Sequence, residues 1–293
     1  MDKIAFIGLG RMGGPMAANL VKAGYDVAGF DLVPEACEKA AKDGIKIAAS
    51  ARHAVDGADV TITMLPTGKH VIALLTEIVP AMNKGALLIE CSTIDVDSAR
   101  AAHALASQAG LISVDAPVSG GTKGAAEGTL TFMCGANDGA LALAEPVLAR
   151  MGHKIIPCGG WGAGQAAKIC NNMILGVNMV AVAEAFVLAE RLGLSHQAMF
   201  DVVSTSSGAS RVLMSACPVP EIVPTSAANN GFKPGFTAAL MSKDMQLSQA
   251  AAASAGAVTP VAARASSLYA DYVAAGNDAE DFSGIINFIR PLK

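Results

Sequence analysis

The sequence predicts an α/β fold in two domains: an N-terminal domain built on a parallel sheet, and an all-α C-terminal domain joined to it by a long helix. Three observations support this fold class. Strand-like and helical patterns alternate through the first half of the 293-residue chain, a glycine-rich turn separates the first strand from the first helix, and the second half carries helical patterns only. We place the domains at 1–161 and 162–293, since this length accommodates two ordinary domains.

The first strand leads directly into the glycine-rich turn. Residues 3–8 (KIAFIG) are apolar, and a helical pattern begins near Met16. In such a unit the first glycine allows tight chain reversal, the second lets a pyrophosphate approach the backbone, and the third lets the helix pack closely on the strand. The sequence therefore predicts a Rossmann-type dinucleotide site, whose turn consists of Gly8, Leu9, Gly10, Arg11, Met12 and Gly13.

An acidic residue ends the second strand-like segment. Asp31 follows residues 26–30 and lies 23 positions after Gly8 (31 − 8), a spacing typical of the acid that binds the adenosine ribose. Its carboxylate would accept hydrogen bonds from the ribose hydroxyls and repel a 2′-phosphate, and no arginine follows at 32–34. The predicted cofactor is therefore NAD, although Asp31 could instead be an ordinary helix cap and Arg11 leaves slight room for NADP.

Further alternation predicts more βαβ units of the same parallel sheet. Because ligands bind beyond the carboxyl ends of such strands, we expect the loops at 65–67 and 91–93 to meet the cofactor and the loop at 116–121 to face it. In that last loop the Ser119 hydroxyl and the amides of the two following glycines could hold a carboxylate, or the glycines could form a plain turn. The expected strands are 59–64, 86–90, 111–115, 129–134 and 153–157, and the expected helices are 70–78, 95–108 and 138–149.

The second half begins with a helical pattern over 164–192 that is apolar on nearly every side, so we expect it to be buried in core and interface. Lys168 and Asn172 lie four residues apart and share one face of it. A buried lysine is costly unless its ammonium is paired or its pKa falls, which makes acid–base chemistry one reason for its presence. The alternative is a lysine that extends to solvent. Further helices are expected at 195–204, 237–255 and 260–275, with an irregular stretch at 217–224.

Composition restricts the classes of partner. A net charge of −4 with one Trp and three Tyr gives neither the basic stripe nor the aromatic platforms of nucleic-acid binding. The longest apolar run, 173–183, is shorter than the roughly 20 residues that span a bilayer, so no membrane role is expected. The dispersed cysteines and histidines show no CxxC or HExxH spacing, so no metal site is expected. With 52% hydrophobic and 16% charged residues, a homodimer or homotetramer is predicted.

The N-terminal residues bear on the location of the protein in the cell. Strand-like sequence starts at Ile4 and leaves no room for a signal peptide, so a cytoplasmic protein is expected, although a processed precursor could have carried one.

Four segments together carry a resemblance to a known family. They are FIGLGRMGGPMAANLVKAG at 6–24, DAPVSGGTKGAAEGTL at 115–130, GAGQAAKICNNM at 162–173 and NNGFKPGFTAALMSKD at 229–244. With these segments in order, the chain resembles the β-hydroxyacid dehydrogenase family over its whole length. The resemblance implies hydride transfer from a small 3-hydroxy acid to NAD, with Lys168 as the catalytic acid–base and Asn172 as the amide beside it. It also implies substrate contacts from Ser119, Gly120, Gly121, Lys243 and Asp244, and cofactor contacts from Leu65, Pro66, Thr93 and Lys243.

Two points stay open at this stage. The charged pair Lys243-Asp244 could be a plain solvated face of a helix. In addition, many members acting on 3-hydroxyisobutyrate carry a tryptophan three residues after the Ser-Ser-Gly at 206–208, where this chain has Arg211. The resemblance implies 3-hydroxyisobutyrate as substrate and valine breakdown as pathway, whereas Arg211 leaves room for tartronate semialdehyde, serine or 3-hydroxypropionate. A non-catalytic NAD-binding module and an imine reductase are further alternatives, which the presence of Lys168 disfavours.

Overall fold

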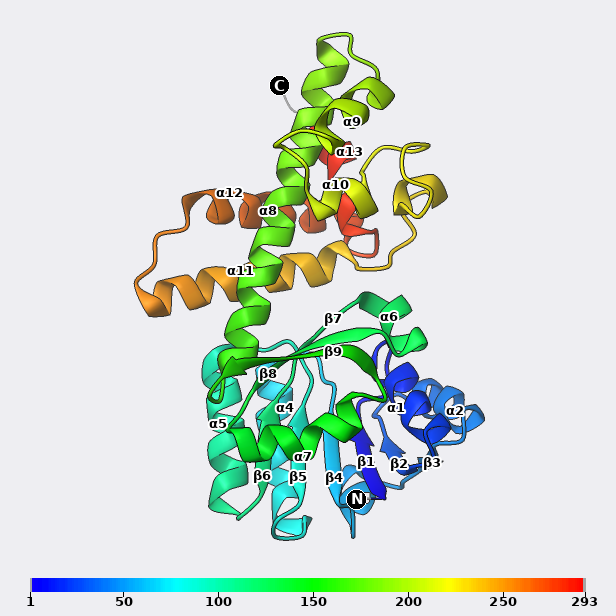
Figure 1. The fold of residues 1–293 in the computed structure, drawn as a ribbon, viewed down its shortest axis with the longest axis vertical. Helices are drawn as coiled ribbons and strands as arrows, with labels where there is room; N and C mark the ends of the chain where they lie inside the picture. The colour runs from blue at the N-terminus through cyan, green and yellow to red at the C-terminus, as the bar shows by residue number, and fades with distance from the viewer. Residues whose placement is uncertain (1, 292–293) are drawn as a thin grey trace. The chain divides into compact units, whose positions relative to one another are not determined.

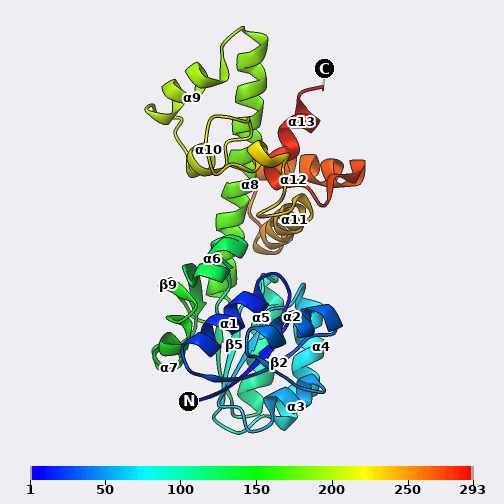
Figure 2. The ribbon, with the colours of Figure 1, turned by 90° about the vertical axis from the view of Figure 1, so that its right-hand side faces the viewer.

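The computed structural model describes residues 2–291 (Figures 1 and 2). The chain divides into two compact units, 1–168 and 169–293. The division falls inside the long helix α8 (Ala163–Arg191), so the first turns of α8 belong to the first unit and the remainder belongs to the second.

The first unit is built on a nine-stranded sheet. Its strand order is β3-β2-β1-β4-β5-β6-β8-β7, with β9 also paired to β8. The strands from β3 to β6 are all parallel, whereas β8 runs antiparallel to both β6 and β7. The strands are β1 (Lys3–Ile7), β2 (Asp26–Phe30), β3 (Lys46–Ile47), β4 (Val60–Thr63), β5 (Leu87–Glu90), β6 (Ile112–Asp115), β7 (Val118–Ser119), β8 (Leu130–Gly135) and β9 (Gly152–Gly159).

Helices cover both faces of this sheet, and alternate residues of a strand enter different cores. In β1, Ile4 and Phe6 pack with residues of α1 and α7, whereas Ala5 and Ile7 pack with residues of α3, α4 and α5. Strands buried on both faces read as continuous apolar runs, which is why the sequence reveals them. The helices are α1 (Gly13–Lys22), α2 (Pro34–Lys42), α3 (Ala51–Val55), α4 (Gly68–Ile78), η1 (Val79–Ala81), α5 (Val96–Gln108), α6 (Gly121–Glu127) and α7 (Asp138–Leu148).

The second unit is helical. Its core gathers Met179 and Phe186 of α8 with residues of α10, α11, α12 and α13. Gly176 allows a close approach of α11 to α8, because a Cβ there would lie 2.5 Å from the sulfur of Met245. Besides α8 the elements are α9 (His196–Ser204), α10 (Arg211–Ala216), η2 (Ala227–Asn230), α11 (Ala238–Ala255), α12 (Pro260–Tyr272), η3 (Val273–Asn277), η4 (Phe282–Gly284) and α13 (Ile285–Ile289).

Helix α8 has an unusual composition for its length. Within residues 2–291 it alone is long and apolar enough to cross a membrane by those two criteria, which the core helix of a soluble protein also meets. Of its most apolar stretch, 39% is buried inside the chain. Ile174 and Leu188 are among its exposed side chains, so a substantial apolar surface of α8 is left uncovered by this chain.

The predicted fold class is confirmed, and the differences are local. The predicted loop at 116–121 contains β7 and the start of α6, because Val118 and Ser119 pair with β8. The antiparallel direction of β8 was not predicted, since strand direction depends on a pairing partner distant in sequence. The short elements α2, α3, β3 and α10 were also missed, because segments of two to nine residues carry little periodicity.

Candidate active site

The glycine-rich turn has the backbone geometry that the sequence predicts. Gly8 has φ of +96°, and a Cβ there would lie 2.3 Å from the carbonyl oxygen of Met64. A Cβ at Gly13 would lie 1.9 Å from the carbonyl oxygen of Gly8. At Gly10, by contrast, a Cβ would meet no atom within 4 Å. The first and third glycines are therefore required by packing, and the open space at Gly10 fits the approach of a pyrophosphate.

Asp31 supports this turn directly. One carboxylate oxygen accepts a hydrogen bond from the Leu9 amide at 2.7 Å, and the other accepts from the Val33 amide at 2.8 Å. The N-cap residue of α2 is Val33, so Asp31 does not cap that helix as the alternative interpretation supposed. The carboxylate lies half-buried beside the glycine turn, where the predicted ribose-binding acid is expected.

The two predicted cofactor loops are joined to each other. Leu65 and Pro66 follow β4, and Thr93 follows β5, the strand that is hydrogen-bonded directly to β4. The Leu65 amide donates a hydrogen bond to Ser92 Oγ at 2.7 Å. A hydroxyl from one loop thus fixes the backbone of the other.

The predicted carboxylate cradle lies where β7 meets α6. Ser119 ends β7, Gly120 is the N-cap residue of α6, and Gly121 is its first residue. Gly120 has φ of +137° and Gly121 has φ of +63°, values that side chains other than glycine rarely adopt. The amide of Gly121 belongs to a first helical turn, where N–H groups have no partner within the helix. A half-buried hydroxyl and backbone amides therefore lie together, as a carboxylate site requires.

Lys168 lies in the second turn of α8 and is only 8% exposed, so it does not extend to solvent. The start of α8 is held by Asp115, the last residue of β6. Its two carboxylate oxygens accept hydrogen bonds from the amides of Gly162 at 2.8 Å and Gln165 at 3.0 Å. Burial raises the pKa of Asp115, and these amide hydrogen bonds oppose that shift. The carboxyl end of the sheet thereby fixes the helix turn that precedes Lys168.

In the second unit, Asn172 and the pair Lys243-Asp244 come together across 72 residues of sequence. Asn172 Nδ2 donates to Asp244 Oδ2 at 2.5 Å, and Lys243 Nζ lies 3.8 Å from Asp244 Oδ1. Asn172 is 2% exposed and Asp244 is 4% exposed. The interpretation of Lys243-Asp244 as a solvated face is therefore wrong, because its carboxylate is buried.

The sequence did not indicate a buried polar cluster in the first unit. Gln165 Nε2 donates to the carbonyl oxygen of Ser92 at 2.7 Å and to Glu90 Oε2 at 3.3 Å. Burial raises the pKa of Glu90 to about 8, although hydrogen bonds from Ser92 and Thr63 act in the opposite direction. The available signal was a carboxylate ending an otherwise apolar strand, which by itself does not identify its partners.

Arg211, the departure from the family pattern, is exposed. It is the first residue of α10, and Ser210 caps that helix by accepting a hydrogen bond from the Leu213 amide at 3.2 Å. The exposed position favours the outward-pointing arginine over one that pairs with a substrate group.

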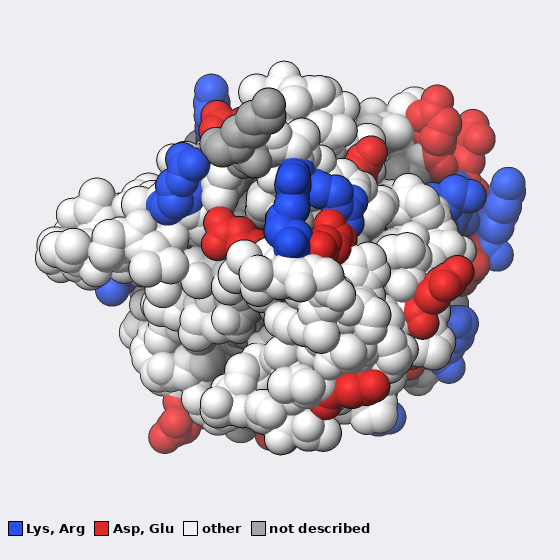
Figure 3. All heavy atoms as spheres, turned by 90° about the horizontal axis from the view of Figure 1, so that it is seen from above, with Lys and Arg blue, Asp and Glu red and all other residues white. Residues whose placement is uncertain are grey.

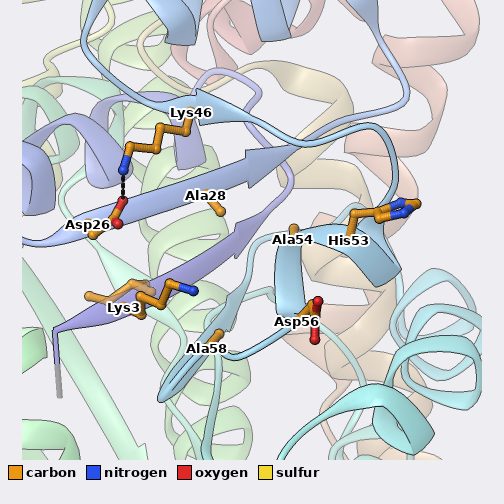
Figure 4. A pocket seen from close by; sticks show the side chains of 9 residues that line it. Lys3, Asp26, Ala28, Lys46, His53, Ala54, Asp56 and Ala58 are labelled. Atoms are coloured by element: carbon orange, nitrogen blue, oxygen red, sulfur yellow. Dashed lines mark ion pairs between the residues drawn. The ribbon is translucent and has the colours of Figure 1, made fainter.

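A separate cavity of about 300 Å³ lies at the amino ends of β1 and β2 (Figure 4). Lys3, His53 and Asp56 line it together with an ion pair in which Lys46 Nζ lies 2.7 Å from Asp26 Oδ1. None of the predicted site residues lines this cavity. Within residues 2–291, no group of three or more His, Cys, Asp or Glu side chains could hold a metal ion.

Models of known protein families match both halves of the chain. Residues 3–160 match the family described as the NAD binding domain of 6-phosphogluconate dehydrogenase. Residues 162–289 match the family described as the NAD-binding domain of NADP-dependent 3-hydroxyisobutyrate dehydrogenase.

Full-length relatives extend the match to the whole chain. A Pseudomonas aeruginosa NAD-dependent L-serine dehydrogenase is 44% identical, covering 100% of this chain and 99% of its own. A 3-hydroxyisobutyrate dehydrogenase from the same organism is 43% identical, covering 99% of each chain. The solved structure of Mycobacterium tuberculosis 3-hydroxyisobutyrate dehydrogenase with L-serine is 52% identical, with a TM-score of 0.96 and 99% of both chains covered.

Proposed function

Because the chain belongs to the β-hydroxyacid dehydrogenase family and is an NAD-dependent oxidoreductase acting on a CH–OH group, we propose that it oxidises 3-hydroxyisobutyrate to methylmalonate semialdehyde. Valine breakdown is the pathway that this substrate implies. The observation that carries the proposal is the buried Lys168, positioned on α8 one turn before the buried Asn172.

Ser119, Gly120 and Gly121 bind the substrate carboxylate in this proposal. The Ser119 hydroxyl and the amides at the start of α6 donate hydrogen bonds to it, and the two glycines, which the positive φ favours there, place no side chain beside it. Binding at the carboxylate orients the carbon that carries the hydroxyl group. Orientation of this kind contributes a large share of catalysis, because it replaces a chance encounter with a fixed geometry.

Lys168 acts as the acid–base group. Bound NAD supplies the hydride acceptor, held by the glycine turn, Asp31 and the loops after β4 and β5. As the C–H bond breaks and the carbonyl forms, the neutral amine of Lys168 takes the hydroxyl proton and becomes an ammonium. In the reverse direction the ammonium returns that proton to the developing alkoxide. Asn172 orients the reacting hydroxyl or the amine without adding charge, since its own amide is held by Asp244.

L-Serine is a second candidate substrate. It is also a 3-hydroxy acid, a relative 44% identical is named an NAD-dependent L-serine dehydrogenase, and the solved structure at 52% identity is described with L-serine. Its ammonium group would need a polar or anionic neighbour that the methyl group of 3-hydroxyisobutyrate does not need. The reduction of tartronate semialdehyde and the oxidation of 3-hydroxypropionate would use the same Lys168 chemistry.

Initial rates of NAD reduction test the choice of substrate. The panel contains both enantiomers of 3-hydroxyisobutyrate, L-serine, 3-hydroxypropionate and D-glycerate, each measured again with NADP. The proposal expects the highest kcat/KM for one enantiomer of 3-hydroxyisobutyrate with NAD. A higher kcat/KM for L-serine would transfer the assignment to that acid, and an absence of turnover on the whole panel would support a non-catalytic module.

We also propose a homodimer or homotetramer in the cytoplasm. Large apolar side chains of the second unit are exposed, including Leu188, Leu192, Val258 and Val261. Because exposed apolar surface of this kind favours association, we propose that a second copy of the chain packs against these side chains. On the face in Figure 3, uncharged residues form most of the surface and basic side chains lie next to acidic ones. Light scattering on the purified protein tests this, since a monomer would contradict it.

A further inference from the structure

We propose that Glu90, Ser92 and Gln165 form a positioning cluster that joins both cofactor loops to the first turns of α8 and thereby sets the place of Lys168 relative to bound NAD. The inference rests on the proposed function for the role of Lys168. The cluster itself is argued from contacts within the first unit.

Gln165 links the helix to the loop after β5. Its Oε1 accepts a hydrogen bond from the Ile94 amide at 3.1 Å, and its Nε2 donates to the Ser92 carbonyl oxygen at 2.7 Å. These two partners flank Thr93, which the family resemblance assigns to the cofactor. A single side chain therefore fixes the backbone on both sides of a predicted cofactor contact.

Ser92 and Glu90 extend the link to the second loop. Ser92 Oγ accepts a hydrogen bond from the Leu65 amide at 2.7 Å, which holds the loop after β4. Glu90 Oε1 accepts from the Ser92 amide at 2.8 Å and from Thr63 Oγ1 at 3.3 Å, while Oε2 accepts from Gln165 Nε2 at 3.3 Å. Both loops and α8 thus meet at one carboxyl group.

The burial of these three side chains favours a role in positioning over a role in stability alone. Gln165 and Ser92 have no exposed surface and Glu90 is 3% exposed. Replacing such a buried polar group and its partner by apolar side chains is often neutral or stabilising, so a polar cluster is not needed to fill this space. Its directional hydrogen bonds do supply what apolar packing lacks, namely one allowed arrangement of the two loops.

Gln165 lies close to Lys168 along α8, which connects the cluster to the proposed acid–base group. Lys168 follows Gln165 by three residues, so the two side chains lie on neighbouring positions of one helix face. Asp115 holds the same turn through the amides of Gly162 and Gln165. A shift of this turn moves the Lys168 amine with it, and a misplacement of about 1 Å can lower a rate by about 100-fold.

Gln165→Met tests the cluster, because methionine keeps the length of the side chain and removes its three hydrogen bonds. We expect kcat to fall by about 10- to 100-fold and the dissociation constant for NAD to rise by about tenfold, measured below the melting temperature of the variant. Thr61→Val is the matched control, because the Thr61 hydroxyl is buried in β4 without a hydrogen-bond partner among residues 2–291. It is expected to leave both constants unchanged.

A rescue experiment separates positioning from general stability. Glu90→Gln replaces one of two accepting oxygens by an amide donor, which then faces either Gln165 Nε2 or the Ser92 amide, both of them donors, so NAD binding and turnover are expected to weaken. Adding Gln165→Glu restores a donor and an acceptor between these two positions but removes the donor to the Ser92 carbonyl oxygen, so the double variant should lose less NAD affinity and turnover than the two single variants together. Impairment of the double variant equal to the sum of the single effects would overturn the proposal. So would a Gln165→Met variant that loses melting temperature but keeps kcat and NAD affinity.

The NAD titrations need no substrate, so they keep the two proposals distinguishable. If the wild-type protein turned over no member of the substrate panel, the proposed function would fail. The rescue of NAD affinity would still decide whether the cluster positions the cofactor loops.

Discussion

The two units hold their predicted site residues by different means. In the first unit the predicted binding groups are mostly backbone amides at strand ends, and glycines with positive φ, such as Gly8 and Gly120, make their conformation possible. In the second unit the buried groups are side chains, and Asn172 and Asp244 hold each other by a hydrogen bond between different helices. Backbone sites of the first kind leave a local signature in the sequence. Side-chain pairs of the second kind become visible only when distant segments are brought together.

The difference also separates the expected consequences of substitution. Loss of a glycine disturbs cofactor binding or packing, depending on which space its Cβ would occupy. Loss of a buried polar side chain leaves its partner without a hydrogen bond, which costs about 1–3 kcal/mol for an uncharged group and more for a charged one. Substitutions of each kind can therefore test which unit contributes to cofactor binding, to turnover and to stability.

The largest effect is expected at Lys168, where α8 passes from one unit to the other. Lys168→Ala removes the proposed acid–base group and should lower kcat by about a thousandfold or more, within the usual range for such groups. NAD affinity should be retained, because the proposed cofactor contacts of the glycine turn and Asp31 do not involve this amine. Initial rates and NAD titration measure the two quantities. Lys154→Ala, an exposed lysine of β9, is the control, and a parallel loss of NAD affinity in Lys168→Ala would make Lys168 a cofactor-binding residue.

A smaller effect is expected at Asn172, in the second unit. Asn172→Leu removes the donor to Asp244 and should lower kcat by about 10- to 100-fold, while the free energy of unfolding falls by about 1–3 kcal/mol. Substrate kinetics and denaturant unfolding measure the two changes. Asn178→Leu on the same helix is the control for apolar substitution. Unchanged kinetics in Asn172→Leu would confine Asn172 to a structural role.

The same difference between local and distant contacts explains which features the sequence predicts. The longer strands, the long helix and the glycine turn were predicted because each depends on neighbouring residues: apolar runs, a helical period and a spaced set of glycines. The apolar neighbours of Lys168 left both burial and extension to solvent open, and the structure shows that the side chain is buried.

What the sequence did not reveal depends on contacts between distant residues. A glutamine in a helix has no local pattern that names its partners, so the hydrogen bonds of Gln165 to residues 71 and 75 positions away were missed. The antiparallel pairing of β6 with β8 was missed for the same reason. The roles of the individual site residues stay predictions that the substitutions above are designed to test.

Alanine substitutions at two glycines of the same turn should affect different properties, namely NAD binding at Gly10 and stability at Gly13. Gly10→Ala adds a methyl group to open space, so the protein should keep its melting temperature while its dissociation constant for NAD rises by about tenfold or more. Gly13→Ala forces a methyl group against the Gly8 carbonyl oxygen and should lower the stability of the unit by about 3 kcal/mol or more. Thermal unfolding and NAD titration of both variants measure this. Equal loss of stability in the two would remove the assignment of Gly10 to the cofactor.

A further effect is expected in the pH dependence of stability, and it arises from Glu90. Its pKa is raised from an ordinary value of 4.5 to about 8 by burial, so between these values the folded protein binds a proton that the unfolded chain has released. The stabilising contribution is therefore complete below 4.5 and is lost as the pH rises toward about 8, with a slope of up to about 1.4 kcal/mol per pH unit.

Glu90→Gln removes the titrating group, so the difference in unfolding free energy between wild type and variant should change with pH across this window. Denaturant unfolding at a series of pH values measures it, with Glu35→Gln in exposed α2 as the control. A difference that stays constant from about 5 to about 8 would mean that Glu90 is ionised throughout this range in the folded protein. In that case the carboxylate is stabilised by its donors from Ser92, Thr63 and Gln165 more strongly than burial destabilises it.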